Sequence, residues 1–163
     1  MFIRAAAIVL RAEPQTQFAI FGTGAQELVL RELAEAVGIS EALSWPGHVP
    51  AAVALERIGI FVSTSYWENA PIALLEAMAA GVPVIATGVA GVPEIATPNT
   101  AELVSPGDPG ATAVAILKLI RDPAFATQQA VRARARIERH FTARKNGEAV
   151  LALYSSLLAR AVA

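Results

Sequence analysis

The most informative segment of the chain covers residues 63–86 and reads STSYWENAPIALLEAMAAGVPVIA. It predicts a polar loop, then a helix over residues 71–80 with Pro71 as its first residue, and then a buried strand over residues 82–86. The run IGIFV at residues 58–62, directly before the segment, predicts a preceding strand. A strand, a helix and a second strand in this order form the unit from which parallel sheets are built.

The same alternation of short apolar runs and helical patterns extends in both directions. Strands are expected over residues 17–21, 42–45 and 101–104, and helices over residues 2–11, 26–37, 51–57, 109–120, 123–140 and 143–161. The runs are continuously apolar, which is typical of strands in a parallel sheet whose two faces are covered. The sequence therefore predicts an α/β fold with a Rossmann-like parallel sheet and helices on both faces. In such sheets, ligands bind at the carboxyl ends of the strands.

The composition excludes several classes of function. The chain has 163 residues, which fits one domain over residues 1–163, with no cysteine and a formal net charge of −1. The lack of cysteine excludes disulfides, a thiol nucleophile and cysteine-ligated zinc, and the near-neutral charge argues against nucleic-acid binding. The two histidines, His48 and His140, lie far apart in the sequence, so no metal site is predicted.

The chain is also unusually apolar, with 55% hydrophobic and 17% charged residues. This surplus indicates either an apolar face left for a partner or a drift of composition towards alanine. Glycines and prolines interrupt the longest uncharged stretch, residues 77–93, and no signal peptide is recognisable, so a cytoplasmic protein is expected. A cationic run over residues 132–145 forms either the solvated face of a helix or a peripheral contact with anionic lipids at a membrane.

The loop before the predicted helix at residues 71–80 is the strongest candidate for a binding site. Glu68, Asn69 and Ala70 lie where unpaired backbone N–H groups and the helix dipole favour a phosphate or another anion. Glu68 and Glu76 suit the hydroxyl groups of a ligand, since one carboxylate accepts hydrogen bonds from both hydroxyls of a diol. Alternatively, Glu68 is a helix-capping acid and Glu76 faces solvent, although the helix around Glu76 offers few polar positions.

Several motifs are similar to those of one enzyme family. They are, in chain order, Phe18-Ala-Ile-Phe-Gly-Thr-Gly, Trp45-Pro-Gly-His-Val, Glu68-x7-Glu76-Ala-Met-Ala-Ala-Gly-Val-Pro-Val, Gly91-Val-Pro-Glu-Ile and Leu103-Val-Ser-Pro-Gly-Asp-Pro. Together they resemble the C-terminal half of the family 4 (group 1) retaining glycosyltransferases of GT-B fold. The resemblance covers most of the chain, and the Glu-x7-Glu block is its most specific part. It implies that the parent protein uses a nucleotide-sugar as its donor substrate.

The resemblance also implies roles for individual residues of this chain. Glu68 is the residue assigned to catalysis and would contact hydroxyls of the donor sugar, while Glu76 would bind the ribose hydroxyls of the nucleotide. The other donor-binding residues are Asn69 and Ala70 through their backbone amides, the glycine pair Gly22 and Gly24, and His48, whose turn would lie near the base. The resemblance implies no metal and no cofactor, so the helix N-terminus and cationic side chains would have to stabilise the diphosphate.

The chain departs from the family pattern in ways that bear on activity. Members have two similar domains, and the reaction takes place between them, whereas this chain resembles one domain. It also lacks that domain's usual first strand and the Gly-Arg and Lys-Gly pairs that accompany this strand. The resemblance therefore implies a donor-binding half of a retaining enzyme that is inactive alone, with an unidentified acceptor and a missing N-terminal domain.

The absent strand also has a structural consequence. By analogy it lies between residues 17–21 and 58–62, so these two strands must close up, leave a gap or accept a strand from elsewhere. An unpaired strand edge favours pairing with another chain, so a homo-oligomer or strand exchange is expected.

Two other functions stay open at this point. The first is a non-catalytic nucleotide-binding or interaction module, the degenerate remnant of an enzyme, which would keep the motifs without the reaction. The second is another GT-B enzyme, such as a sugar-nucleotide epimerase, which fits less well because the Glu-x7-Glu block favours transferases. Selective nucleotide binding that depends on Glu76 would distinguish the donor-site hypothesis from the remnant.

Overall fold

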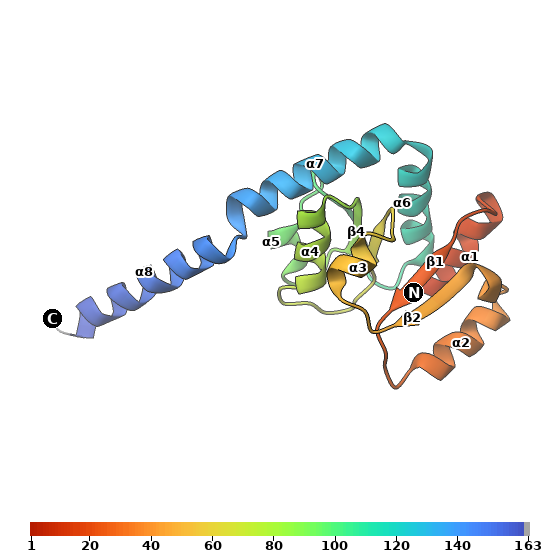
Figure 1. Ribbon diagram of the computed structural model, residues 1–163, viewed down its shortest axis with the longest axis horizontal. Helices are drawn as coiled ribbons and strands as arrows, with labels where there is room; N and C mark the ends of the chain where they lie inside the picture. Colours follow the sequence, from red (N-terminus) through yellow and green to blue (C-terminus); the bar gives the residue numbers. More distant parts are fainter. Residues whose placement is uncertain (162–163) are drawn as a thin grey trace.

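The computed structural model describes residues 1–161 as helices alternating with short strands (Figure 1). The helices and the single 3-10 turn are α1 (Phe2–Ala12), α2 (Glu27–Ala36), η1 (Ser40–Ala42), α3 (Ala51–Leu55), α4 (Ile72–Ala80), α5 (Val92–Ile95), α6 (Pro109–Arg121), α7 (Pro123–His140) and α8 (Ala143–Ala161). The strands are β1 (Phe18–Phe21), β2 (Leu43–Gly47), β3 (Phe61–Ser63), β4 (Val84–Thr87) and β5 (Glu102–Val104).

The strands form two parallel sheets instead of one. β1 pairs with β2, with Phe18 opposite Leu43, and the other sheet has the order β3-β4-β5, with Phe61 opposite Val84. The predicted parallel α/β architecture is confirmed. Of the three outcomes left open for the absent strand, the described residues show the gap, since β1 and β3 each pair along one edge only.

Strand β4 lies between two layers of helices. Ile85 packs into a core with residues of α1 and α6, whereas its neighbours Val84 and Ala86 pack into a second core with residues of α4 and α7. Because successive side chains of a strand point to opposite faces, the two cores cover opposite faces of the sheet. The predicted covering of both faces is therefore confirmed.

Several element ends differ from the prediction. The strand expected over residues 58–62 begins only at Phe61, whose N–H donates to the carbonyl of Pro83, because residues 58–60 face the gap and have no strand beside them. Residue Ala42 closes the 3-10 turn instead of opening β2. Pro71 precedes α4 as its N-cap, in an extended conformation, and the helix begins at Ile72. The bounds of α7 and α8 are as predicted.

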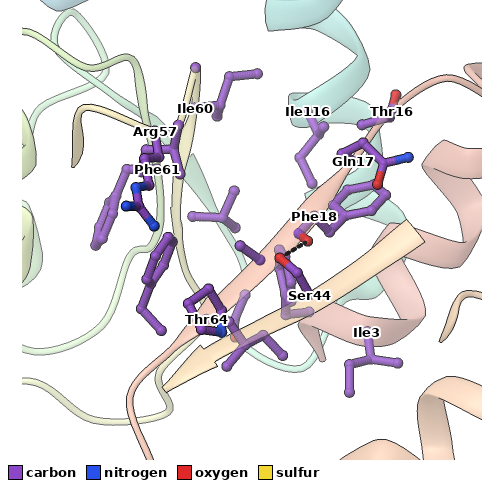
Figure 2. Close-up of a pocket in the computed structure, with 18 of the residues that line it drawn as sticks. Ile3, Thr16, Gln17, Phe18, Ser44, Arg57, Ile60, Phe61, Thr64 and Ile116 are labelled. Atoms are coloured by element: carbon purple, nitrogen blue, oxygen red, sulfur yellow. Dashed lines mark hydrogen bonds between the residues drawn. The ribbon is translucent and has the colours of Figure 1, made fainter. Parts of the chain in front are cut away.

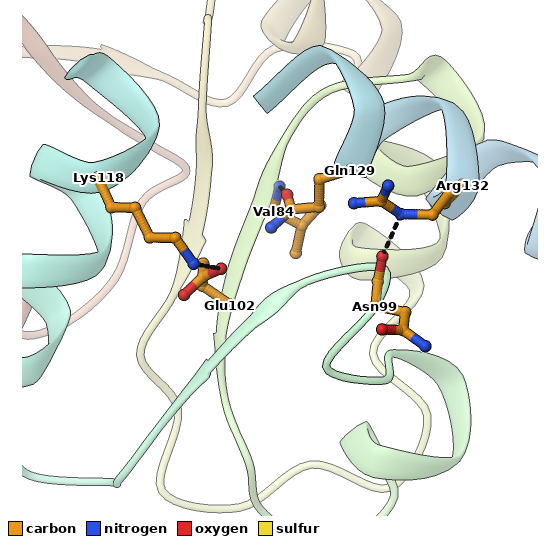
Figure 3. Close-up of polar contacts among 6 residues, drawn as sticks. All are labelled: Val84, Asn99, Glu102, Lys118, Gln129 and Arg132. Carbon is orange, nitrogen blue, oxygen red and sulfur yellow. Dashed lines mark hydrogen bonds and ion pairs between the residues drawn. The ribbon is translucent and has the colours of Figure 1, made fainter. Parts of the chain in front are cut away.

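Two side chains of α7 bind it to the β4-β5 sheet (Figure 3). The Oε1 of Gln129, a residue that is 1% exposed, accepts a 2.9 Å hydrogen bond from the N–H of Val84 at the start of β4. Arg132 Nε donates to the carbonyl oxygen of Asn99 over 2.8 Å, just before β5. These two hydrogen bonds fix the position of strands β4 and β5 relative to α7.

The cationic run on α7 has a mixed role. Arg136 donates from Nε to the carbonyl of Ile95 and from Nη2 to that of Glu94, so its guanidinium satisfies carbonyls of α5. Arg134 instead pairs on the surface with Glu138. The predicted solvated face is therefore only part of the explanation, since Arg132 and Arg136 hold the backbone of the 94–99 segment.

Helix α8 projects away from the rest of the chain (Figure 1). It exposes several large apolar side chains, which are Val150, Leu151, Leu153, Tyr154, Leu157 and Leu158. Part of the apolar surplus seen in the composition thus lies on a surface helix. Within residues 1–161, no helix combines the length and the apolarity needed to cross a bilayer.

Candidate functional site

Residues 64–71 form the loop that joins β3 to α4, and hydrogen bonds to neighbouring residues fix its shape. The hydroxyl of Ser65 donates to Oε1 of Glu68 over 2.7 Å, which holds the carboxylate across the loop. The hydroxyl of Thr87, at the end of β4, donates to the carbonyl of Ser65 over 2.6 Å. The N–H of Gly91 donates to the carbonyl of Glu68 over 3.0 Å. Glu68 is therefore oriented through both its side chain and its backbone.

Gly91 is where the segment after β4 meets this loop most closely. A Cβ added at Gly91 would lie 1.6 Å from the carbonyl oxygen of Asn69. The φ of Gly91 is −77°, which any residue adopts, so the requirement for glycine here is a matter of space. Its neighbour Ala90 has a φ of +40°, in the left-handed region that costs a residue with a side chain some strain. The close approach at Gly91 shows that the β4-α5 connection packs tightly against the loop.

The first turn of α4 offers unpaired backbone donors next to Glu68. The carbonyl of Pro71 accepts from the N–H groups of Leu74 and Leu75, and no side chain caps the helix. Within the described part of the chain, the N–H groups of Ile72 and Ala73 have no hydrogen-bond partner. Such a turn favours an anion through these free donors and through the helix dipole.

Glu76 lies on the exposed side of α4. Leu74, Ala77 and Met78 are completely buried on the opposite side, and Glu76 is the only polar residue among Ile72–Ala80. It lies about 6 Å along the helix axis from Ile72, at 1.5 Å per residue. Its side chain is exposed, as the solvent-facing alternative predicts, and it lines neither of the two hollows near the strand ends.

The other predicted donor-binding residues lie at the ends of β1 and β2. Gly22 donates its N–H to the carbonyl of Gly47 over 2.7 Å, which brings the glycine turn beside the turn that carries the exposed His48. Gly22 and Gly24 line a hollow of about 330 Å³ between the end of β1 and the start of α2. No hydrogen bond within residues 1–161 connects this group to the Glu68 loop.

The ends of three strands nevertheless meet around one larger cavity. Phe21 of β1, Pro46 of β2 and Thr64 directly after β3 all line it, and Figure 2 shows Thr64 beside the tips of β1 and β2. Glu68 and Glu76 are not among its lining residues. The structure thus places all predicted site residues after the strands or on the helix that follows, in two groups on either side of the gap.

Sequence reasoning did not find two residues that shape the site. Ser65 was detectable in principle, since a serine three residues before an acid in a polar loop is a common local hydrogen-bonding pattern. Thr87 was not, because its contact with Ser65 depends on the pairing of β3 with β4.

The sequence matches known glycosyltransferases. The family model described as glycosyl transferases group 1 matches residues 1–138. The lipopolysaccharide core biosynthesis mannosyltransferase LpcC of Rhizobium leguminosarum bv. viciae is 31% identical over 125 residues, which are 76% of this chain and 36% of that protein. The chain thus spans little more than a third of the length of this curated relative.

Solved structures show the same fold. The C-terminal domain of a group 1 glycosyl transferase (LpcC) from Francisella tularensis matches with a TM-score of 0.79 at 24% identity, over 87% of this chain and 78% of that chain. Anabaena HepE in complex with UDP-glucose matches with a TM-score of 0.82 at 23% identity, over 94% of this chain and 44% of that chain. The fold is that of the C-terminal, Rossmann-like domain of a GT-B protein.

Proposed function

The chain belongs to the group 1 glycosyl transferases, and from this premise we propose that it is the donor-binding part of an enzyme that transfers a sugar from a nucleotide-sugar. The observation that carries the proposal is the uncapped first turn of α4 beside a loop that orients Glu68. This turn would receive the diphosphate, with the backbone N–H groups of Asn69, Ala70 and Ile72 nearby. The HepE structure, whose ligand is UDP-glucose, supports this class of donor.

The two carboxylates would bind the transferred sugar and the ribose of the donor. Glu68 is held by Ser65 at the entrance of the loop, so it would accept hydrogen bonds from hydroxyls of the transferred sugar. Glu76 lies further along the exposed side of α4 and would accept hydrogen bonds from both ribose hydroxyls. Gly22, Gly24 and His48, across the gap, would lie along the nucleotide.

In the reaction, the bond between the anomeric carbon and the diphosphate oxygen breaks, and the electron pair stays on the diphosphate. The acceptor hydroxyl oxygen forms the new bond on the same face of the sugar, and its proton leaves with the diphosphate. Negative charge therefore develops on the leaving group, where free N–H groups at the start of α4 would stabilise it. Retention at the anomeric carbon is part of this proposal.

The proposal extends to the state of the isolated chain. Because the chain spans 36% of the length of the curated relative, the acceptor site would lie in another domain, and we expect little or no transfer by the chain alone. Self-association and contact with a membrane surface stay predictions, for which light scattering and vesicle sedimentation are the direct measurements.

Calorimetric titration of the chain with UDP, GDP and ADP tests the proposal. We expect one of the three to bind selectively and Glu76→Ala to weaken it by about tenfold or more, because a hydrogen-bonded carboxylate is lost. Glu35→Ala, which removes an exposed glutamate of α2, is the matched control and should bind like the wild type. Failure of all three nucleotides to bind would favour the non-catalytic remnant, and unchanged binding by Glu76→Ala would contradict the assigned role.

A further inference from the structure

The carboxylate of Glu68 is held by a series of hydrogen bonds that begins inside the sheet. The hydroxyl of Thr87, a residue that is 1% exposed, donates to the carbonyl of Ser65 over 2.6 Å. The hydroxyl of Ser65 in turn donates to Oε1 of Glu68 over 2.7 Å. Thr87 ends β4, the middle strand of its sheet, where it lies opposite Val104 of β5. The orientation of the carboxylate is therefore set from a buried strand and not by the loop alone.

The Glu68–Ser65 pair presents only hydrogen-bond acceptors to a ligand. A carboxylate has no proton to donate, and Ser65 uses its single hydroxyl proton on Glu68. Glu68 is half-buried, and within residues 1–161 no other side chain hydrogen-bonds or ion-pairs with its carboxylate. Its remaining lone pairs therefore suit the hydroxyl groups of a sugar.

The segment around this pair contains no cationic side chain. Residues 58–117, which include the strands β3, β4 and β5 and the loops after them, have no lysine, arginine or histidine. Of the two cations that flank the segment, Lys118 pairs with Glu102 over 2.7 Å (Figure 3). The other, Arg57, precedes β3, whereas the Glu68 loop follows that strand. A second carboxylate brought to Glu68 would therefore meet a like charge that no cation of this segment balances.

We propose that Ser65 and Thr87 are positioning residues, which hold Glu68 so that the site takes a neutral sugar and rejects an acidic one. The inference rests on the proposed donor site, in which Glu68 contacts the transferred sugar. A neutral hexose donates hydrogen bonds to the free lone pairs of Glu68. A hexuronic acid offers similar hydroxyls but adds a carboxylate, which the charge of Glu68 repels. A glutamate free to rotate would turn away from that charge, so the discrimination depends on Ser65.

Calorimetric titration with three ligands of one base tests the proposal. The ligands are UDP, UDP-glucose and UDP-glucuronic acid, or their guanosine or adenosine counterparts if one of those bases binds instead. The readout is the ratio of the Kd for the glucuronic acid compound to the Kd for the glucose compound, which a general loosening of the fold leaves unchanged. We expect a ratio of at least about five in the wild type. The ratio should fall to about one in Glu68→Gln, which removes the charge and keeps the shape of the side chain.

Substitutions at the two positioning residues should act on the same ratio. Ser65→Ala should lower it by about threefold, while the Kd for the nucleoside diphosphate stays within about twofold of the wild-type value. Thr87→Val should lower it as well, whereas Ser65→Thr and Thr87→Ser, which keep the hydroxyl, should preserve it. In the Glu68→Gln background, Ser65→Ala should have no further effect, because Ser65 acts through Glu68. Ser40→Ala, which removes an exposed hydroxyl at the start of η1, is the matched control.

The possible results separate this inference from the donor site on which it rests. A wild-type ratio near one, or a ratio that Ser65→Ala leaves unchanged, would overturn the inference while the donor site stands. Equal weakening of all three ligands by Ser65→Ala would also overturn it, since Ser65 would then have only a structural role. If the wild type binds no nucleotide and no nucleotide-sugar, the donor site itself is wrong, and the inference is wrong with it.

Discussion

Gly91→Ala should weaken nucleotide binding at least about tenfold while the protein stays folded. The new Cβ would overlap the carbonyl oxygen of Asn69, to which its distance would be 1.6 Å, so one of the two backbones must move. Movement breaks the hydrogen bond from the Gly91 N–H to the carbonyl of Glu68 and shifts the loop that carries the donor-binding amides. We expect a stability loss of about 1–3 kcal/mol in urea unfolding, typical of overpacking, and a loss of nucleotide affinity of at least about tenfold.

Gly147→Ala is the matched control for this substitution. Gly147 lies in α8, and a Cβ there has nothing within 4 Å. Alanine favours a helix by up to about 1 kcal/mol over glycine, so this control should be as stable as the wild type or slightly more stable, with unchanged nucleotide affinity. Wild-type binding by Gly91→Ala would show that the close approach of the two loops has no part in the site.

Leu74→Ala should cause a large loss of stability. Leu74 is completely buried in the core that joins α4 to β4 and α7. Removal of a buried leucine side chain costs about 2–5 kcal/mol through lost burial and the cavity left behind. The urea midpoint and the extrapolated free energy of unfolding measure this loss.

Ile72→Ala provides the comparison on the same helix. Ile72 is 69% exposed, so its truncation should change the free energy of unfolding by only about 0.5 kcal/mol. Equal losses for the two variants would mean that α4 is not packed in the orientation described. That orientation is what presents Glu76 outward, so such a result would also count against the donor site.

Local signals predict most of the elements well. The Asp-Pro pair at residues 108–109 predicts the start of α6 with Asp108 as its N-cap, and Oδ1 of Asp108 accepts a 2.8 Å hydrogen bond from the N–H of Ala111. The bounds of α7 and α8 follow from prolines and apolar spacing that act within a few residues. The sequence places β3 too early because an apolar run marks burial, whereas the start of a strand depends on the partner beside it.

Local signals also predict part of the candidate site, but only part of it. The loop with Glu68, its position before α4 and the presence of Glu76 on that helix can be read from consecutive residues. The contacts of Thr87 and Gly91 with the loop depend on segments more than 20 residues away, which meet it only in the folded sheet. Local patterns thus identify the binding groups, and tertiary packing determines how they are oriented.

The proposed donor site can be mapped residue by residue by NMR. In a ¹⁵N-labelled sample of the chain, saturating amounts of the tightest-binding nucleotide among UDP, GDP and ADP should shift the amide signals of Asn69, Ala70, Ile72 and Ala73 most strongly. Smaller shifts should appear at Gly22 and His48, and signals from α8 should not change. If a nucleotide binds and these four amides stay unshifted, the start of α4 does not hold the diphosphate, and the proposed donor site is wrong.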